Sequence, residues 1–150
     1  MKKKFFCSLA VCSVCMTAVI FTGVIEATEE TKKSEVIVEL VTKRAEAMSR
    51  YFAGVAEYSL AEELLRDIES GELLADDLLN LSAYTNTDID QILYCQVTEV
   101  LITDEDEFYI TADVTVEWMT CGLDGTGVMD VTYAVVCEKQ GNTLKLVGFF

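Results

Sequence analysis

The sequence contains no histidine, and this limits the chemistry that its side chains can perform. Without an imidazole, Ser-His-Asp and Cys-His catalysis, the usual zinc sites and the simplest neutral-pH switch are excluded. An enzymatic function would have to rest on carboxylates and tyrosines, since the chain has 26 Asp and Glu and 6 Tyr. From the residue types alone we expect no catalytic residue, no cofactor and no bound metal ion.

Cysteines are the other reactive side chains. Three of the six lie in an apolar N-terminal segment, and the other three are Cys95, Cys121 and Cys137. Three is an odd number for a domain in an oxidising location. The expected strand pairing separates Cys121 from Cys137 by more than the ~7 Å that a disulfide allows between Cα atoms. We therefore expect buried free thiols rather than a disulfide.

Two acidic stretches offer the oxygen ligands that Ca²⁺ prefers. Residues 104–107 are four consecutive carboxylates in an expected turn, where such side chains mostly point into solvent. Asn86, Asp88 and Asp90 are spaced like the first ligands of a calcium loop. Gln91 stands where that loop needs glycine, and Val97 stands where it needs the closing glutamate. Neither stretch predicts a calcium site.

The charge of the chain is unevenly distributed. Of the 11 Lys and Arg, three precede the apolar segment, which leaves 8 basic against 26 acidic residues, a net charge of −18. Between Asp67 and Glu138 there is no Lys or Arg. Such a surface repels phosphate backbones and anionic lipids, so we expect no nucleic-acid partner and no peripheral membrane binding.

The N-terminus predicts an export or anchor segment. Three lysines precede residues 5–25, a run of 21 residues without a charge, and acidic residues follow it. This length is close to the ~20 residues that span a bilayer, and the flanking charges place the body of the protein outside. The sequence Ile25-Glu26-Ala27 is also a passable cleavage site. Residues 1–27 are thus a signal peptide or a retained anchor, 28–33 a polar spacer and 34–150 one extracytoplasmic domain.

Helices are predicted in the first half of that domain. Ser34 is a suitable N-cap for an amphipathic helix whose apolar stripe is Ile37, Val41, Ala45, Met48, Phe52 and Val55. Ser59 and Glu62 fit a capping box for a second helix, which buries Leu64, Leu65 and Ile68 and ends at Gly71. Residues 73–81 predict a short third helix with Leu74, Leu78 and Leu81 inward.

Strands are predicted in the second half. Residues 108–119 and 131–138 alternate between apolar and polar with a period of two, which is typical of half-buried strands. Residues 92–103 and 143–150 supply a first and a fourth strand, joined by short turns. Helices followed by four such strands predict an α+β domain with two or three helices on one face of an antiparallel meander.

The glycine-rich segment between the two central strands predicts a hairpin. A turn at Asp124-Gly125 puts both apolar rows on one face of the sheet. The expected opposite pairs are Trp118 with Val131, Val116 with Tyr133, Val114 with Val135, and Ala112 with Cys137.

A long amphipathic helix, a shorter one and then twisted antiparallel strands resemble the cystatin-like and NTF2-like α+β roll. With a membrane segment in front, the layout is similar to small extracytoplasmic bacterial NTF2-like proteins, including VirB8-type components. In isomerases of that roll an Asp base and Tyr donors face a cavity, which would make Tyr94, Tyr133 and Asp113 candidates. Strand alternation points Tyr133 inward and Asp113 outward, so the two do not converge.

Three functions follow as hypotheses. The first is a non-catalytic interaction or assembly module, anchored through residues 5–25 or secreted, that binds a protein partner or itself through a sheet face or edge. The second is a small-ligand domain whose pocket residues are Tyr94, Tyr133, Trp118, Met48 and Phe52. The third is a carboxylate-dependent isomerase or hydrolase.

Overall fold

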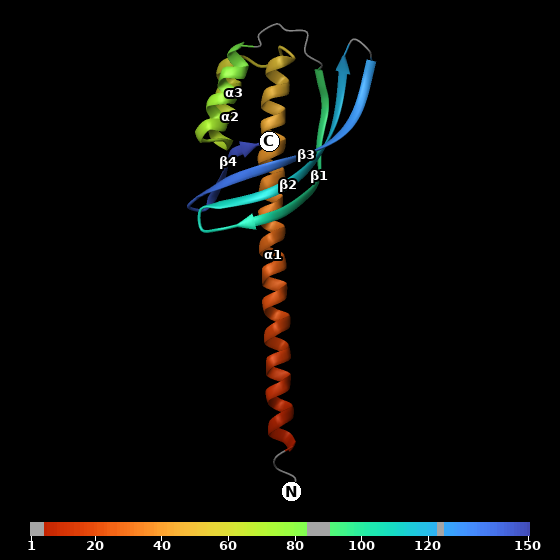
Figure 1. Cartoon of the computed structure of the whole chain (residues 1–150), viewed down its shortest axis with the longest axis vertical. Helices are drawn as coiled ribbons and strands as arrows, with labels where there is room; N and C mark the ends of the chain where they lie inside the picture. Colours follow the sequence, from red (N-terminus) through yellow and green to blue (C-terminus); the bar gives the residue numbers. More distant parts are fainter. Residues whose placement is uncertain (1–4, 84–90, 123–124) are drawn as a thin grey trace. The chain divides into compact units, whose positions relative to one another are not determined.

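The computed structural model describes residues 5–83, 91–122 and 125–150, and side chains from residue 29 onward. Its elements, in chain order, are α1 (Phe5–Phe52), α2 (Tyr58–Ile68), α3 (Gly71–Ala83), β1 (Gln91–Glu105), β2 (Tyr109–Gly122), β3 (Gly125–Gln140) and β4 (Thr143–Phe149). The four strands form one antiparallel sheet in the order β1-β2-β3-β4 (Figure 1). The predicted α+β class and the meander are confirmed.

The chain divides into two compact units, Met1–Glu35 and Val36–Phe150. We expected a helix to begin at Ser34, but α1 includes Ser34 and the polar residues before it. Glu and Lys are good helix formers, and no Gly or Pro interrupts residues 26–34. The ion pair between Lys33 and Glu29 adds support one turn apart.

The predicted membrane segment, residues 5–25, lies outside the residues whose side chains are described. Among the side chains that the structure does describe, no helix combines the length and the apolar character that crossing a membrane requires. The membrane or signal role of residues 5–25 therefore stays a prediction.

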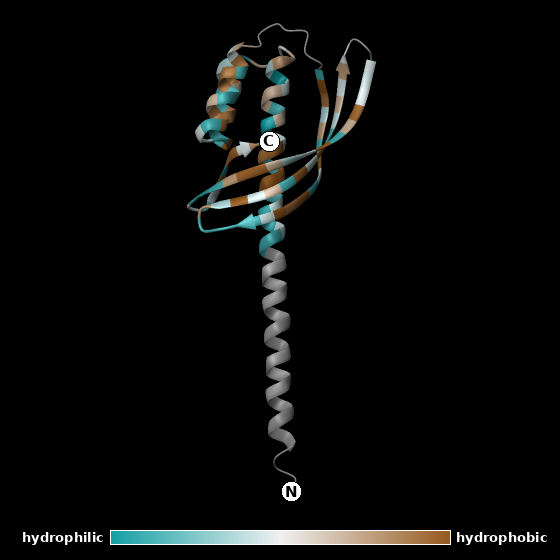
Figure 2. Cartoon of the chain, in the orientation of Figure 1, coloured by the Kyte–Doolittle hydropathy of each residue, from teal (hydrophilic) through white to brown (hydrophobic). Residues whose placement is uncertain are grey.

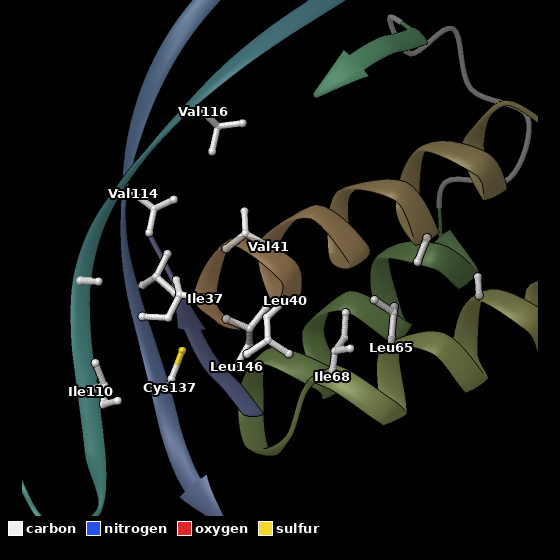
Figure 3. Close-up of a cluster of buried hydrophobic side chains, with 14 of the residues drawn as sticks. Ile37, Leu40, Val41, Leu65, Ile68, Ile110, Val114, Val116, Cys137 and Leu146 are labelled. Carbon is white, nitrogen blue, oxygen red and sulfur yellow. The ribbon is translucent and has the colours of Figure 1, made fainter. Parts of the chain in front are cut away.

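The apolar stripe of α1 supplies one wall of the core in the unit Val36–Phe150. Ile37, Val41 and Ala45 are buried, while Met48 and Phe52 are partly buried. Figure 3 shows Ile37 and Val41 directed toward side chains of the sheet. Val55, which we expected on this stripe, is 70% exposed because α1 ends at Phe52.

Helices α2 and α3 complete the helical layer, with two corrections to their expected ends. The N-cap of α2 is Glu57 without a side-chain cap bond, so Ser59 and Glu62 form no capping box. Instead, Glu62 accepts a hydrogen bond of 2.7 Å from Arg66 one turn later. Gly71 begins α3 rather than ending α2, because α2 already stops at Ile68.

The expected burial of α2 and α3 holds for most positions. Leu65, Ile68 and Leu81 are buried, and Leu74 and Leu78 pack against the core. Leu64 is the exception, since 37% of it is exposed. Leu65 faces the core directly, which turns its neighbour on the helix toward solvent.

The β2–β3 hairpin has the predicted faces but a different register. The observed opposite pairs are Trp118 with Met129, Val116 with Val131, Val114 with Tyr133, Ala112 with Val135, and Ile110 with Cys137. Gly122 pairs with Gly125, so the two-residue loop lies one position earlier than we predicted. The register therefore shifts by two residues, and a shift of two leaves every side chain on its expected face.

β1 carries one extra residue relative to β2 at three places. The irregularities fall at Leu93, Thr98 and Thr103. Thr98 Oγ1 and Thr103 Oγ1 each donate to a β2 carbonyl at 3.2 Å. Such bulges bend a strand and increase its twist, and Figure 1 shows β1, β2 and β3 strongly curved.

Candidate functional site

Three charged side chains meet inside the helical layer: Arg44 of α1, Glu69 after α2, and Asp77 of α3. Arg44 Nε donates to Glu69 Oε1 at 3.0 Å and to Asp77 Oδ2 at 2.8 Å, and its Nη2 donates to Asp77 Oδ1 at 2.9 Å. The exposed fractions of the Glu69 and Asp77 side chains are 0% and 4%. We call these three residues the Arg44 cluster.

Two carboxylates share one guanidinium in the Arg44 cluster. Burial, and then the nearby charge of Asp77, raise the pKa of Glu69 from 4.5 to about 8, against the opposite influence of Arg44. Glu69 Oε2 is buried and has no hydrogen-bond partner. A protonated Glu69 balances the single positive charge with a single negative one, so the cluster is neutral at pH 7.

Aromatic side chains extend from the Arg44 cluster along the inner face of the sheet. Arg44 Cζ lies 4.4 Å from the centre of the Phe149 ring, a cation–π distance. The Phe149 ring centre is 4.5 Å from that of Tyr133, and Tyr133 is 6.3 Å from Trp118. Trp118 Nε1 is buried without a partner. The row therefore joins β4, β3 and β2 on one face.

The segment between α2 and α3 also binds the edge of β4 through its backbone. The Ser70 N–H donates to the Leu146 carbonyl at 2.9 Å, and Glu69 forms a parallel bridge with the same residue. Lys145 Nζ donates to the Arg66 carbonyl at 2.7 Å. These contacts hold Glu69 beside Arg44 and cover the outer side of β4.

The Arg44 cluster can store a proton, but its carboxylates have almost no contact with solvent. A general acid or base must reach the proton of a substrate within hydrogen-bond distance. Glu69 is fully enclosed and Asp77 nearly so. The geometry therefore fits a buried network that joins three helices and β4, rather than a catalytic centre.

The apolar stripe predicted for α1 does not include Arg44, so the Arg44 cluster was not predicted. A signal was present in the spacing. Arg44 lies three residues after Val41 and four after Leu40, both buried. Asp77 lies three residues after Leu74 and four before Leu81, within an inward stripe. Helical periodicity thus placed both charges on apolar faces.

The five predicted pocket residues lie in two different environments. Met48, Phe52, Trp118 and Tyr133 are partly buried and pack against the core. Tyr94 is 43% exposed on β1, and its hydroxyl donates to Gln96. The structure therefore groups the first four on the inner side and leaves Tyr94 apart from them.

Asp113 and Tyr133 lie on opposite faces of the sheet. Tyr133 packs against the core, whereas Asp113 is exposed and faces Ala134 across the strands. The expectation that this pair does not converge is confirmed.

Two carboxylates of the acidic turn between β1 and β2 form bonds within the protein. Asp106 Oδ1 accepts the backbone N–H groups of Phe108 and Tyr109, each at 2.7 Å, and these bonds hold the pKa of Asp106 below its usual range. Glu105 pairs with Lys139 at 2.7 Å. In the described part of the chain no three acidic, Cys or His side chains gather as metal ligands would. The other calcium-like stretch, residues 86–90, lies outside the described residues.

Cys95, Cys121 and Cys137 are free thiols, as expected, but of the three only Cys137 is buried, and Cys95 and Cys121 are partly exposed. Cys137 faces Ile110 rather than the predicted Ala112, and Cys95 faces Trp118. Burial raises the pKa of Cys137 to about 12 and also raises that of Cys95. These two thiols are therefore poor nucleophiles at neutral pH.

β1 forms a free edge of the sheet. None of its 15 residues is buried, and Leu93 and Leu101 are 55% and 58% exposed. Within the described ranges, β2 is the only strand that pairs with β1, and no other backbone hydrogen bond reaches it. Its unpaired main-chain groups can receive an additional strand.

Comparison with known proteins leaves the function to be argued from this geometry. No protein-family model matches the chain, and no curated protein matches its sequence.

Proposed function

We propose that this chain is a non-catalytic interaction module of the extracytoplasmic space, anchored through residues 5–25 or secreted, which binds a protein partner by adding a strand to β1. The proposed relationship is to the cystatin-like and NTF2-like rolls, which its helices followed by antiparallel strands resemble, although four strands are fewer than in the fuller NTF2 sheet. The sheet is the binding element in this proposal, and the helical layer supports it.

The observation that carries the proposal is the different treatment of the two sheet edges. The outer side of β4 is covered by Glu69 and Ser70, which bond to Leu146. The outer side of β1 has no such cover among the described residues. Proteins usually protect exposed edges against unwanted pairing. β4 bonds to the helical layer at Leu146, whereas β1 and residues 125–133 of β3 each have β2 as their only described partner strand. β1 is the longer of these two open edges, with 15 residues, which supports a binding role for it.

A photo-crosslinking experiment tests the proposal in intact cells that express the full chain. A benzophenone amino acid replaces Leu101 on β1 in one variant and Leu79 on α3 in a matched control. The two leucines are similarly exposed, at 58% and 65%. We expect a discrete higher-mass adduct from the β1 position and none from the α3 position. Equal adducts from both positions, or none from either, would contradict edge binding.

Protease accessibility tests the location independently. Protease added outside intact cells should digest the body of the protein and leave a fragment that contains the N-terminus. Protection of the body would refute the extracytoplasmic assignment without bearing on how β1 binds.

A further inference from the structure

The charges around β1 indicate what kind of segment it binds. We infer that the partner of β1 is an extended basic segment in which Lys or Arg alternates with apolar residues. This inference rests on the proposed function, and it names the chemical class of the partner.

Negative charge surrounds the free edge. On β1 itself, Glu99 is exposed at the centre of the strand, and Asp104 is exposed near its end. Residues 91–138 contain ten Asp and Glu but no Lys or Arg. Figure 2 shows the end of β1 next to the acidic turn coloured as hydrophilic. β1 and β2 carry no Lys or Arg that would repel a cationic strand, and the cation of Lys139 on β3 reaches β1 at its last residue, where it pairs with Glu105.

The outer face of the sheet continues this charge inward from the edge. Glu117 on β2 lies directly opposite Asp130 on β3, and Asp113 is exposed on the same face of β2. Like charges directly opposite each other destabilise a sheet. An added strand would lie about 10 Å from β2, two strand spacings away. This exceeds the Debye length of ~8 Å, so its cations would interact mainly with Glu99 and Asp104 on β1 itself.

The two faces of β1 account for the alternation in the proposed segment. Glu99 and Asp104 lie on the outer face, whereas Val97, Val100 and Ile102 lie on the inner face and pack against the core. Leu101 adds an exposed apolar side chain to the outer face, where it pairs with Asp113. Leu93 is 55% exposed at the first bulge. In strand addition, main-chain bonds supply affinity and alternate side chains supply specificity. A segment that alternates cationic and apolar residues matches both properties of this edge.

A second copy of the chain fits the same edge poorly. Pairing of two β1 strands would bring Glu99, Asp104 and their copies together with no cation on either strand. The whole chain carries a net charge of −15, so two copies also repel each other at longer range. Inward or edge charges of one sign are a known protection against self-pairing. The same charges attract a basic partner.

The test measures binding of labelled synthetic peptides to the full chain in a neutral detergent, by fluorescence anisotropy at physiological salt. The probe is a seven-residue peptide of alternating Lys and Val. One control peptide replaces Lys with Glu, and another replaces Val with Pro, which keeps the charge, removes the N–H of every second residue and disfavours pairing as a strand. The protein variants are Glu99→Lys on β1 and, as a charge-matched control, Glu63→Lys on the exposed side of α2.

We expect the Lys-Val peptide to bind, both control peptides to bind at least about tenfold more weakly, and Glu99→Lys to weaken binding about tenfold. Glu63→Lys should change the affinity less than about twofold. If the Lys-Pro peptide binds as tightly as the Lys-Val peptide, or if Glu63→Lys weakens binding as much as Glu99→Lys does, only general charge attraction is present and the inference fails. If the Glu-Val peptide binds equally well, strand addition stands but the basic class is wrong. Absence of binding by all three peptides overturns the inference, while the crosslinking experiment still decides the proposed function.

Discussion

Replacing Glu69 with glutamine should remove a defined part of the pH dependence of stability. Glutamine has the shape of glutamate and cannot ionise, so it reproduces the protonated form that the Arg44 cluster holds. The Glu69 side chain is completely buried, and the substitution therefore changes no surface contact. We expect Glu69→Gln to be close to wild type at pH 5 and more stable than wild type at pH 7.

The magnitude follows from the pKa of Glu69 in the two states. It is about 8 in the folded chain and 4.5 for an ordinary glutamate. Between these values the folded chain holds a proton that the unfolded chain has lost. The contribution of Glu69 is therefore complete below pH 4.5 and decreases up to pH 8 by about 1.4 kcal/mol for each pH unit. From pH 5 to pH 7 the difference between the variant and wild type should grow by about 3 kcal/mol.

Urea unfolding of the full chain in neutral detergent measures this difference. Trp118 is the only tryptophan and packs against the core, so its fluorescence reports unfolding of the domain. Glu63→Gln on the exposed side of α2 is the matched control and should shift the free energy of unfolding equally at both pH values. If the advantage of Glu69→Gln is the same at pH 5 and pH 7, Glu69 is ionised throughout and the argument is wrong.

Three further perturbations separate the core, the Arg44 cluster and the β4 edge. Leu146→Ala, at a fully buried position, should lower the free energy of unfolding by roughly 2–5 kcal/mol, whereas Leu79→Ala should cost less than about 0.5 kcal/mol in the same urea assay. Arg44→Met should cost on the order of 3–5 kcal/mol at pH 7, because it leaves the buried Asp77 without its cation and Glu69 without its donor, and a loss below about 1 kcal/mol would contradict the network. Ser70→Pro removes the N–H that covers β4 and should cause concentration-dependent association in analytical ultracentrifugation, whereas Ser70→Ala keeps that N–H and should remain unassociated.

Periodicity in the sequence was sufficient to predict the class and order of the elements. Alternation over residues 108–119 and 131–138 identifies strands because side chains on a pleated strand change face at each residue. The stripe through Ile37, Val41 and Ala45 identifies the inner side of α1, because residues four apart lie on the same face of a helix. Both patterns report which face is apolar, and the structure buries those faces.

The same patterns do not determine register or bulges. Trp118 opposite Val131 and Trp118 opposite Met129 give the same inward face, so alternation cannot distinguish them. The position of the loop between Gly122 and Gly125 decides between these registers. The bulges at Thr98 and Thr103 depend on hydroxyl bonds to specific carbonyls of β2, contacts that exist only after the strands have paired.

The Arg44 cluster shows a different limit of prediction, since it joins residues from separate elements. Each of its charges can be placed on an apolar helix face from spacing alone. Their meeting requires the packing of α1, α2 and α3 to be known, because Arg44 and Asp77 are 33 residues apart in the chain. Without that packing, an isolated charge on a helix is correctly expected to face water.

The helical layer and the sheet edges are linked through one short segment. The side chain of Glu69 pairs with Arg44, and the backbone N–H of the next residue, Ser70, bonds to the Leu146 carbonyl. The residue that takes up the proton, Glu69, therefore belongs to the segment that covers β4, at the opposite edge of the sheet from β1. If β4 were open as well, an unintended strand could extend the sheet there. Under the proposed function, covering β4 at Leu146 removes one competing edge, so the buried cluster would help to direct a partner to β1 without touching it.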